Sequence, residues 1–217
     1  MKYKAYIFDF DYTLGDSTMG IVKSVNYALG KLGYEEKETL EIRKTIGFSL
    51  TATYEILTGK SNKEEAELFS KYFREMADEI MVEYTNIYPG VEKLFTDIRE
   101  NGGKIGIVTT KYGYRIEHIL SKFDMEHLVD VIIGGDDVKV PKPDPEGIIT
   151  AAKRLNVNEK EILYVGDSLV DAETAFNAGV DFVAVLTGTT KSEDFDKFPY
   201  VAIVNDVGDK NDNFLEK

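Results

Sequence analysis

The sequence predicts an α/β protein, with a parallel sheet that carries helices on both faces and an all-helical segment inserted near its start. Two patterns predict this fold. From residue 91 onward, short apolar runs alternate with segments of helical periodicity, and such alternation is typical of a parallel sheet. Between the first apolar run and residue 84 lie about 70 residues with helical spacing and no convincing strand, which indicates an inserted helical region.

The elements before residue 90 follow from the spacing of apolar side chains. The run Tyr3–Phe10 is aromatic and β-branched and ends in acidic residues, so we expect a buried strand there. Apolar residues keep helical spacing over Ile21–Leu32 and again over Phe69–Ile80. Asn62, with Glu65 three places later, is typical of a helix start.

The elements after residue 90 alternate between helix and strand and are punctuated by glycine. In chain order we expect helix Val91–Glu100, strand Lys104–Val108, helix Tyr114–Lys122, strand Val131–Ile133, helix Asp144–Leu155, strand Glu161–Val165, helix Leu169–Ala178, strand Phe182–Val185 and strand Tyr200–Val204. Gly102 and Gly103 end the first of these helices, and Gly179 ends the last. We therefore expect a sheet of parallel strands joined by helical crossovers.

The composition limits the kinds of site that the chain can carry. With 217 residues, of which 43% are hydrophobic and 30% charged, the chain is long enough for one domain of ordinary size and a smaller second one. It contains no cysteine and only two histidines. The absence of cysteine excludes disulfides, thiol nucleophiles and cysteine-ligated metal sites. Histidine-based chemistry is poorly supplied as well.

The charge balance limits the partners. The chain has 26 basic and 39 acidic residues and a formal net charge of −13. This field repels nucleic acid phosphates and anionic membrane surfaces, so we expect neither as a partner. A small anionic substrate stays compatible, since distant charges are screened within about 8 Å. The N-terminal residues do not resemble a signal peptide, and no apolar run approaches the roughly 20 residues of a membrane span. We expect a soluble, cytoplasmic protein, and the sequence carries no signal for its oligomeric state.

Polar side chains follow four of the expected strands. In open α/β sheets, ligands bind beyond the carboxyl ends of the strands, so these side chains would share one rim. They are Asp9, Asp11 and Thr13 after the first strand; Thr109, Thr110 and Lys111 after the second; Lys142 in the segment after the third; and Asp167, Ser168 and Asp171 after the fourth.

Asp9 and Asp11 are the strongest candidates for chemistry, because they end an apolar strand. Two residues apart, both can reach the rim only if the chain turns there. That geometry suits one carboxylate that attacks a phosphoryl group while its neighbour handles the leaving-group proton. The pattern Asp-x-Asp alone is weak, since Asp194 and Asp196 repeat it in a polar stretch with no strand before it. We interpret that second copy as a solvated turn.

Four motifs in order resemble the haloacid dehalogenase-like superfamily. They are Asp9-Phe10-Asp11-Tyr12-Thr13-Leu14, Thr109, Lys142 within Lys-Pro-Asp-Pro, and Gly166-Asp167-Ser168 with Asp171. The resemblance covers essentially the whole chain, and the segment Gly47-Phe48-Ser49 looks like the cap loop of the phosphoglycolate phosphatase-like branch. It implies a Rossmann-like catalytic core formed by residues 1–14 and 87–217, and an inserted helical cap domain formed by residues 15–86.

The resemblance also implies roles for the rim residues. Asp9 would be the nucleophile that forms an aspartyl-phosphate, and Asp11 the general acid and base. Thr109 would hydrogen-bond the phosphoryl group, and Lys142 would hold phosphate and nucleophile together. Candidate substrate contacts are Thr110, Lys111, Gly47 and Phe48.

A magnesium ion is the cofactor that this resemblance implies. Asp9, Asp167 and the backbone carbonyl of Asp11 would bind Mg²⁺, and Asp171 would support it from its neighbourhood. The donor chemistry agrees, since converging carboxylates repel without a cation and hard oxygen ligands select Mg²⁺. One departure stands at Tyr12, where this family usually has glycine. Because tyrosine tolerates a positive φ poorly, we expect either the turn geometry or the contacts of the tyrosine ring to be unusual there.

We therefore expect a Mg²⁺-dependent phosphatase that acts on a small phosphorylated metabolite, with phosphoglycolate-like compounds or sugar phosphates as first candidates. The alternative enzyme is a β-phosphoglucomutase-like phosphotransferase. Mutases of that type carry a histidine in the first cap helix, near where Ile21 stands here, so its absence favours hydrolysis. Dehalogenases lack the second aspartate, which Asp11 supplies. A regulatory binding protein that retains the fold is the non-enzymatic alternative, but loss of Asp9 or Asp11 would be its signature, and both are present.

Overall fold

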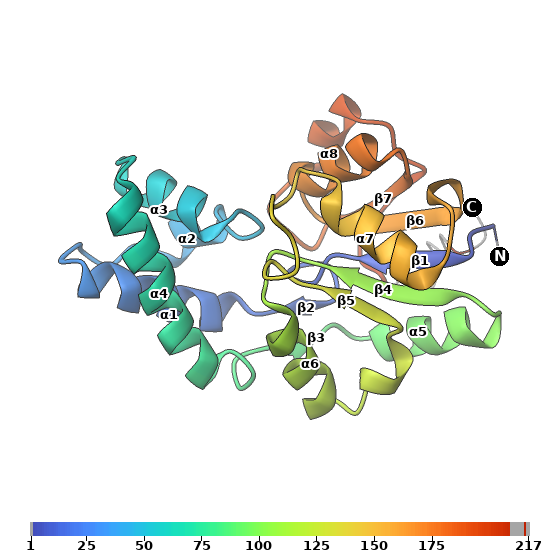
Figure 1. Cartoon of the computed structure of the whole chain (residues 1–217), viewed down its shortest axis with the longest axis horizontal. Coiled ribbons are helices and arrows are strands. Elements are labelled where there is room, and N and C mark those ends of the chain that lie inside the picture. The colour runs from blue at the N-terminus through green and yellow to red at the C-terminus, as the bar shows by residue number, and fades with distance from the viewer. Residues whose placement is uncertain (1, 209–214, 216–217) are drawn as a thin grey trace. The chain divides into compact units, whose positions relative to one another are not determined.

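The computed structural model describes residues 2–208 and 215. The chain divides into two compact units. Unit 1 contains Met1–Asp16 and Ile87–Lys217, and unit 2 contains Ser17–Asn86. Figure 1 shows unit 2 as the blue to teal helices α1 to α4 and unit 1 as the elements around the sheet. In the part of the chain that is described, no helix has the length and apolar character that crossing a membrane requires.

Unit 1 is built on a six-stranded sheet with the order β5-β4-β1-β6-β7-β8. The strands are β1 (Ala5–Phe8), β4 (Lys104–Val108), β5 (Val131–Ile133), β6 (Ile162–Gly166), β7 (Asp181–Val185) and β8 (Ala202–Val204). All neighbouring strands run parallel. The predicted fold class, a parallel α/β sheet with helices, is confirmed.

Helices pack on both faces of this sheet because successive strand side chains point to opposite faces. They are α5 (Val91–Glu100), α6 (Gly113–Lys122), α7 (Glu146–Leu155) and α8 (Leu169–Ala178). Figure 1 shows α7 and α8 on one side of the sheet and α5 on the other. In β1, Ile7 belongs to the core cluster with α7 and α8, whereas Phe8 packs its ring 5.3 Å from that of Phe95 in α5. Short 3₁₀ helices lie at Glu126–Leu128, Glu159–Glu161 and Ser192–Lys197.

The first strand is shorter than the sequence predicts. It covers Ala5–Phe8 and not Tyr3–Phe10. The amide of Asp9 still donates to the carbonyl of Val165 at 2.9 Å, and the chain then turns away. The turn places Phe10, which is fully buried, outside the ladder. The sequence places Phe10 in the strand because its side chain is apolar, but its backbone belongs to the turn.

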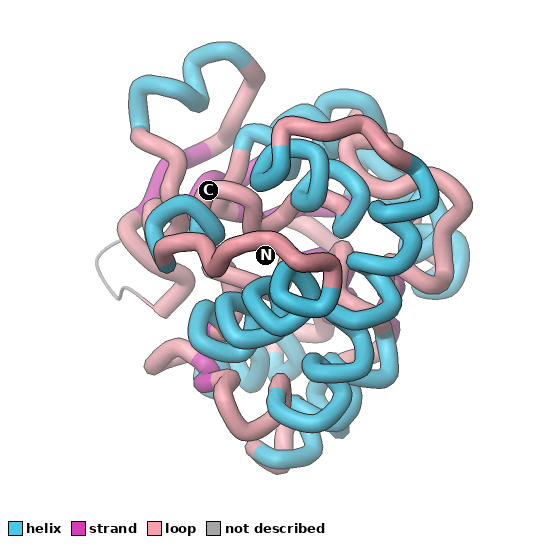
Figure 2. The backbone as a smooth tube through the Cα atoms, turned by 90° about the vertical axis from the view of Figure 1, so that its left-hand side faces the viewer, coloured by secondary structure: helices cyan, strands magenta, loops and turns pink. Residues whose placement is uncertain are grey.

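Unit 2 contains helices α1 (Thr18–Lys31), α2 (Thr39–Arg43), α3 (Leu50–Thr58) and α4 (Lys63–Ile80). Apolar faces of these helices meet in one core, in which Tyr54 and Phe69 are fully buried. The side chain of Asn62 caps α4 by accepting from the amides of Glu64 and Glu65, as the sequence predicts. Figure 2 shows the helices in cyan from a second direction.

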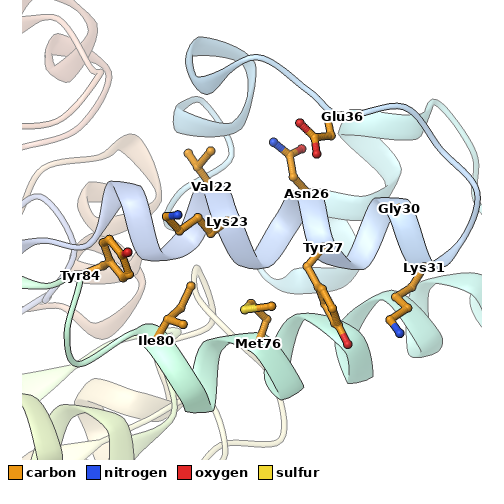
Figure 3. A pocket seen from close by; sticks show the side chains of 10 residues that line it. All are labelled: Val22, Lys23, Asn26, Tyr27, Gly30, Lys31, Glu36, Met76, Ile80 and Tyr84. Atoms are coloured by element: carbon orange, nitrogen blue, oxygen red, sulfur yellow. The ribbon is translucent and has the colours of Figure 1, made fainter.

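A groove runs along α1 and α4 within unit 2 (Figure 3). It has a volume of about 570 Å³. Tyr27 lines it from α1, Met76 and Ile80 line it from α4, and Tyr84 lines it from the turn after α4. None of the residues that the sequence marks as site candidates lines it.

The chain passes between the units through two short strands, β2 (Gly15–Asp16) and β3 (Asn86–Ile87), which pair with each other. At the two ends of unit 2, the Thr85 hydroxyl donates to the Ser17 hydroxyl at 3.0 Å, and both side chains are buried. The sequence does not predict these strands, because two residues are too few to show a period.

Candidate active site

Side chains from several strand ends of unit 1 converge at the carboxyl edge of the sheet. Asp9 follows β1, Thr109 follows β4 and Asp167 follows β6, while Lys142 lies in the segment between β5 and α7. The four strands that precede these residues, β5, β4, β1 and β6, are neighbours in one parallel sheet, whose carboxyl ends share an edge. Asp9, Thr109 and Asp167 are buried.

Lys142 is the centre of this arrangement. Its Nζ lies 2.9 Å from Oδ1 of Asp9 and 2.6 Å from Oδ1 of Asp171. It also donates to the hydroxyl of Tyr164 at 3.3 Å. The Lys142 side chain is only 5% exposed, so both ion pairs are shielded from water. Burial alone would lower the pKa of Lys142, but the charges of Asp171 and Asp9 outweigh it and hold the pKa well above its ordinary value.

Asp171 is fixed by partners on both of its carboxylate oxygens. Oδ1 accepts from the Tyr164 hydroxyl at 3.0 Å as well as from Lys142. Oδ2 accepts from the amide of Ser168 at 3.1 Å and from its hydroxyl at 2.5 Å. Ser168 in turn caps α8, so the two residues form a capping box at the start of that helix. Asp171 is wholly buried, and its hydrogen bonds to Tyr164 and Ser168 orient the carboxylate toward Lys142.

Asp9, Asp167 and Asp171 form an acidic cluster. One oxygen from each lies within 4.8 Å of the others, and all three residues are buried. Burial raises the pKa of Asp9 to about 7, against the attraction of Lys142 and with the repulsion of Asp171. Burial, followed by the charges of Asp171 and Asp9, raises the pKa of Asp167 well above its usual range. These carboxylates therefore resist being charged together, and a cation among them would relieve that repulsion.

Asp11 lies on the turn after β1 and faces a different cation. Its Oδ2 lies 3.2 Å from Nζ of Lys111, and both side chains are buried. Within the described residues, its Oδ1 is buried and has no hydrogen-bond partner, although buried polar atoms are nearly always paired. The next residue, Tyr12, has a φ of 59°. The expected unusual turn is thus present, with a tyrosine in the left-handed region that glycine usually occupies.

Comparison with known proteins identifies the family. The family model of haloacid dehalogenase-like hydrolases matches residues 6–185. This chain belongs to that family. The resemblance inferred from the four motifs is confirmed.

Named relatives of this haloacid dehalogenase-like hydrolase are phosphatases. A phosphoglycolate phosphatase from Cereibacter sphaeroides is 36% identical over 190 residues, which cover 84% of each chain. A pyrophosphatase PpaX from Bacillus mycoides is 31% identical over 185 residues, covering 85% of this chain and 84% of that one. A solved structure from Bacteroides fragilis, named as a haloacid dehalogenase-like hydrolase, has a TM-score of 0.92 and 40% identity, and covers 95% of this chain and 99% of that one.

The segment after β4 carries three of the predicted site residues of this hydrolase. The Thr109 hydroxyl accepts from the amide of Lys111 at 3.2 Å, which bends the chain back on itself. Lys111 then reaches Asp11, as described above, and Thr110, between Thr109 and Lys111 in the sequence, is half-buried. A Cβ on Gly135 would lie 2.4 Å from the carbonyl oxygen of Thr110, so only glycine lets these two segments pack so closely.

Gly47 and Phe48 are not among the residues that converge in unit 1. They belong to unit 2, between α2 and α3. Gly47 has a φ of 97°, a conformation that favours glycine. Phe48 is 41% exposed.

Two groups in the site were missed by the sequence reasoning. Tyr164 lies in the middle of β6 and looked like ordinary core, yet its hydroxyl donates to Asp171 and accepts from Lys142. The only signal in the sequence is the hydroxyl of a tyrosine within an expected buried strand, since a buried tyrosine hydroxyl usually has a hydrogen-bond partner. The second group is the segment after β7, at Thr187 and Gly188, which carries no carboxylate or lysine to attract attention.

Proposed function

We propose that this protein is a Mg²⁺-dependent phosphatase that hydrolyses a small phosphorylated metabolite through an aspartyl-phosphate on Asp9. Its family and its phosphatase relatives make it a phosphoric monoester hydrolase. The observation that carries the proposal is the Lys142 ammonium held between Asp9 and Asp171, with Asp11 on the turn two residues after Asp9. In this proposal residues 1–14 and 87–217 are the catalytic core, and residues 15–86 are the cap.

The reaction divides into two steps. In the first, an oxygen of Asp9 attacks the phosphorus, the bond from phosphorus to the leaving oxygen breaks, and Asp11 gives that oxygen a proton. In the second, Asp11 takes a proton from water as the water oxygen attacks the phosphorus. The bond to Asp9 then breaks and inorganic phosphate leaves. Thr109 and Lys142 bind phosphoryl oxygens in both steps, and Lys142 offsets charge that gathers on them.

The residues present fit a magnesium ion. The donors are carboxylate and carbonyl oxygens, which suit Mg²⁺ better than softer metals, and the raised pKa values of Asp9 and Asp167 indicate a cluster that a cation would stabilise. Asp9, Asp167 and the Asp11 carbonyl would hold the ion, and Asp171 would support it. When bound, Mg²⁺ supplies positive charge at the phosphoryl oxygens.

The substrate is proposed to be a phosphoglycolate-like compound or a sugar phosphate. Nζ of Lys111 lies 3.2 Å from the carboxylate of Asp11, the proposed acid and base. Thr110 and Lys111 would therefore contact the part of the substrate beyond the phosphoryl group. Gly47 and Phe48 would contribute from the cap. The net charge of −13 disfavours nucleic acid as a substrate.

A phosphate-release screen tests this function. The panel contains 2-phosphoglycolate, several sugar phosphates and inorganic pyrophosphate, each with Mg²⁺ and with excess EDTA. We expect Mg²⁺-dependent release from at least one phosphate monoester. Release from pyrophosphate alone would move the assignment toward pyrophosphatase chemistry, and no release from any compound would overturn the proposal.

A further inference from the structure

The segment after β7 lies against the acidic cluster although it contributes no charged side chain. Gly166 of β6 pairs with Ala184 of β7, so the residues after each strand emerge side by side. The amide of Leu186 still bonds to the carbonyl of Val204 in β8 at 3.0 Å. Residues 187 and 188 are therefore the first beyond the sheet, at the edge where Asp167 stands.

Gly188 is in contact with the carboxylate of Asp167. A Cβ placed on Gly188 would lie 1.9 Å from Oδ2 of Asp167 and 2.7 Å from its Cγ. Real Cβ atoms do not approach other atoms so closely, so any side chain at 188 must displace Asp167 or the loop. Gly188 is not among the glycines with a positive φ. The demand for glycine here is therefore one of space and not of backbone conformation.

Thr187 reaches the other side of the site. Its hydroxyl donates a hydrogen bond to the carbonyl of Tyr12. The amide of Tyr12 donates to the carbonyl of Gly15 at 2.8 Å, so the left-handed residue is fixed at both of its peptide groups. Since Tyr12 follows Asp11 directly, Thr187 holds the turn that carries Asp11.

We infer that Thr187 and Gly188 are positioning residues of the active site: Gly188 sets the place of the Asp167 carboxylate, and Thr187 sets the turn that presents Asp11. Neither residue touches the reacting atoms. This inference rests on the proposed function, because it concerns how the chain prepares the metal-binding and acid–base groups named there. Outer partners of this kind typically change metal affinity by about 10- to 100-fold when they are altered.

A calorimetric titration with Mg²⁺ tests the role of Gly188 without any turnover. For Gly188→Ala we expect Mg²⁺ binding weakened by about tenfold or more, with the far-ultraviolet circular dichroism of the wild type retained. The matched control is Gly30→Ala in α1, where a Cβ would meet nothing within 4 Å; its Mg²⁺ affinity should equal that of the wild type. Wild-type affinity in Gly188→Ala would overturn this role of Gly188. If the wild type itself binds no Mg²⁺, the proposed function fails first, and this inference with it.

Thr187 is tested by a pair of variants, which also decide the matter if Gly188→Ala does not fold. Thr187→Val keeps the shape but removes the donor, so we expect kcat to fall by about tenfold or more while KM stays within about twofold, with a shifted pH profile of kcat. Thr187→Ser retains the hydroxyl and should restore kcat and the profile. Equal kinetics in the valine and serine variants would overturn the role of Thr187.

Discussion

Asp9 is the residue on which the proposed chemistry depends most directly. Asp9→Asn keeps the size of the side chain and an oxygen that can accept from Lys142, but it removes the attacking charge. We expect phosphatase activity to fall by about three orders of magnitude or more, with an unchanged circular dichroism spectrum. The control is Asp194→Asn, which alters the second Asp-x-Asp pair on an exposed 3₁₀ helix and should keep full activity. A tenth of the wild-type rate in Asp9→Asn would exclude covalent catalysis at this residue.

The raised pKa of Asp9 also predicts a pH dependence of stability. Because its pKa is about 7 in the folded protein and 3.8 in the unfolded chain, the folded state holds the proton more tightly. The resulting stabilisation is complete below pH 3.8 and is lost as the pH rises through 7. In metal-free protein, we expect the free energy of unfolding to fall between these pH values by an amount on the order of 2–4 kcal/mol from this group.

Urea unfolding at several pH values, in EDTA, measures this dependence. Asp9→Asn should show a shallower fall than the wild type across the same window, because its side chain does not titrate. Asp194→Asn is the control and should follow the wild type, since the Asp194 side chain is 43% exposed and is not part of the acidic cluster. Curves of equal slope for the wild type and Asp9→Asn would contradict the assigned pKa.

At this scale the sequence revealed the charged groups but not the groups that hold them. Asp9, Lys142, Asp167 and Asp171 are recognisable because they follow strand ends in a family order, and the structure brings them together. Tyr164 could not be recognised, since a tyrosine in a buried strand is usually core. Neither could Gly188, since the space it leaves is visible only once β6 and β7 are paired.

Among the elements, helix α1 distinguishes hydrolysis from phosphoryl transfer. Enzymes that resemble β-phosphoglucomutase carry a histidine in the first cap helix near this position, and that histidine would keep water from the aspartyl-phosphate. Here Ile21 is only 9% exposed and belongs to the apolar core of unit 2, as its spacing in the sequence predicts. An isoleucine has no ionisable group, so position 21 cannot exchange a proton here.

We accordingly expect free phosphate to be the dominant product. Incubation with β-glucose 1-phosphate and a bisphosphate primer, followed by coupled detection of glucose 6-phosphate, measures the competing transfer. Glucose 6-phosphate should form at less than about a tenth of the rate of phosphate release, since Ile21 carries no ionisable group that could keep water from the aspartyl-phosphate. Faster formation of glucose 6-phosphate than of phosphate would replace the phosphatase proposal with the mutase.

The regular elements of unit 1 are the part of the fold that the sequence predicts best. Helices Val91–Glu100 and Leu169–Ala178 and strands Lys104–Val108 and Val131–Ile133 have the predicted bounds, because glycine, acidic or prolyl residues delimit them. The order of the strands across the sheet could not be read, since it depends on how the crossovers wind and not on any local period. Helix α2 was not predicted separately, because five residues are too short to show a hydrophobic face.

Considered as a whole molecule, the protein carries a large negative charge and a buried acidic cluster, and both favour divalent cations. We expect Mg²⁺ and Ca²⁺ each to raise the melting temperature of metal-free protein. The free energy of unfolding should rise by about 2.7 kcal/mol when the cation concentration is 100 times the dissociation constant. Only Mg²⁺ should support turnover, because the larger and looser coordination shell of Ca²⁺ misplaces Asp9.

Differential scanning calorimetry and the phosphate-release assay, run on the same samples, separate these two effects. Asp167→Asn should reduce the thermal gain from both cations. Full activity in excess EDTA, or equal activity with Ca²⁺ and Mg²⁺, would argue against the proposed role of the metal.

The hydrogen bond between Ser17 and Thr85 has a consequence for how such a protein can change over time. It places the two ends of the segment 17–86 beside each other, and inserts with adjacent ends can be exchanged at little cost to the host. Unit 2 is thus an inserted domain that can be exchanged as one segment. A chimera that carries the corresponding segment of a relative would need only two junctions, at β2 and β3, and would show which unit determines substrate preference.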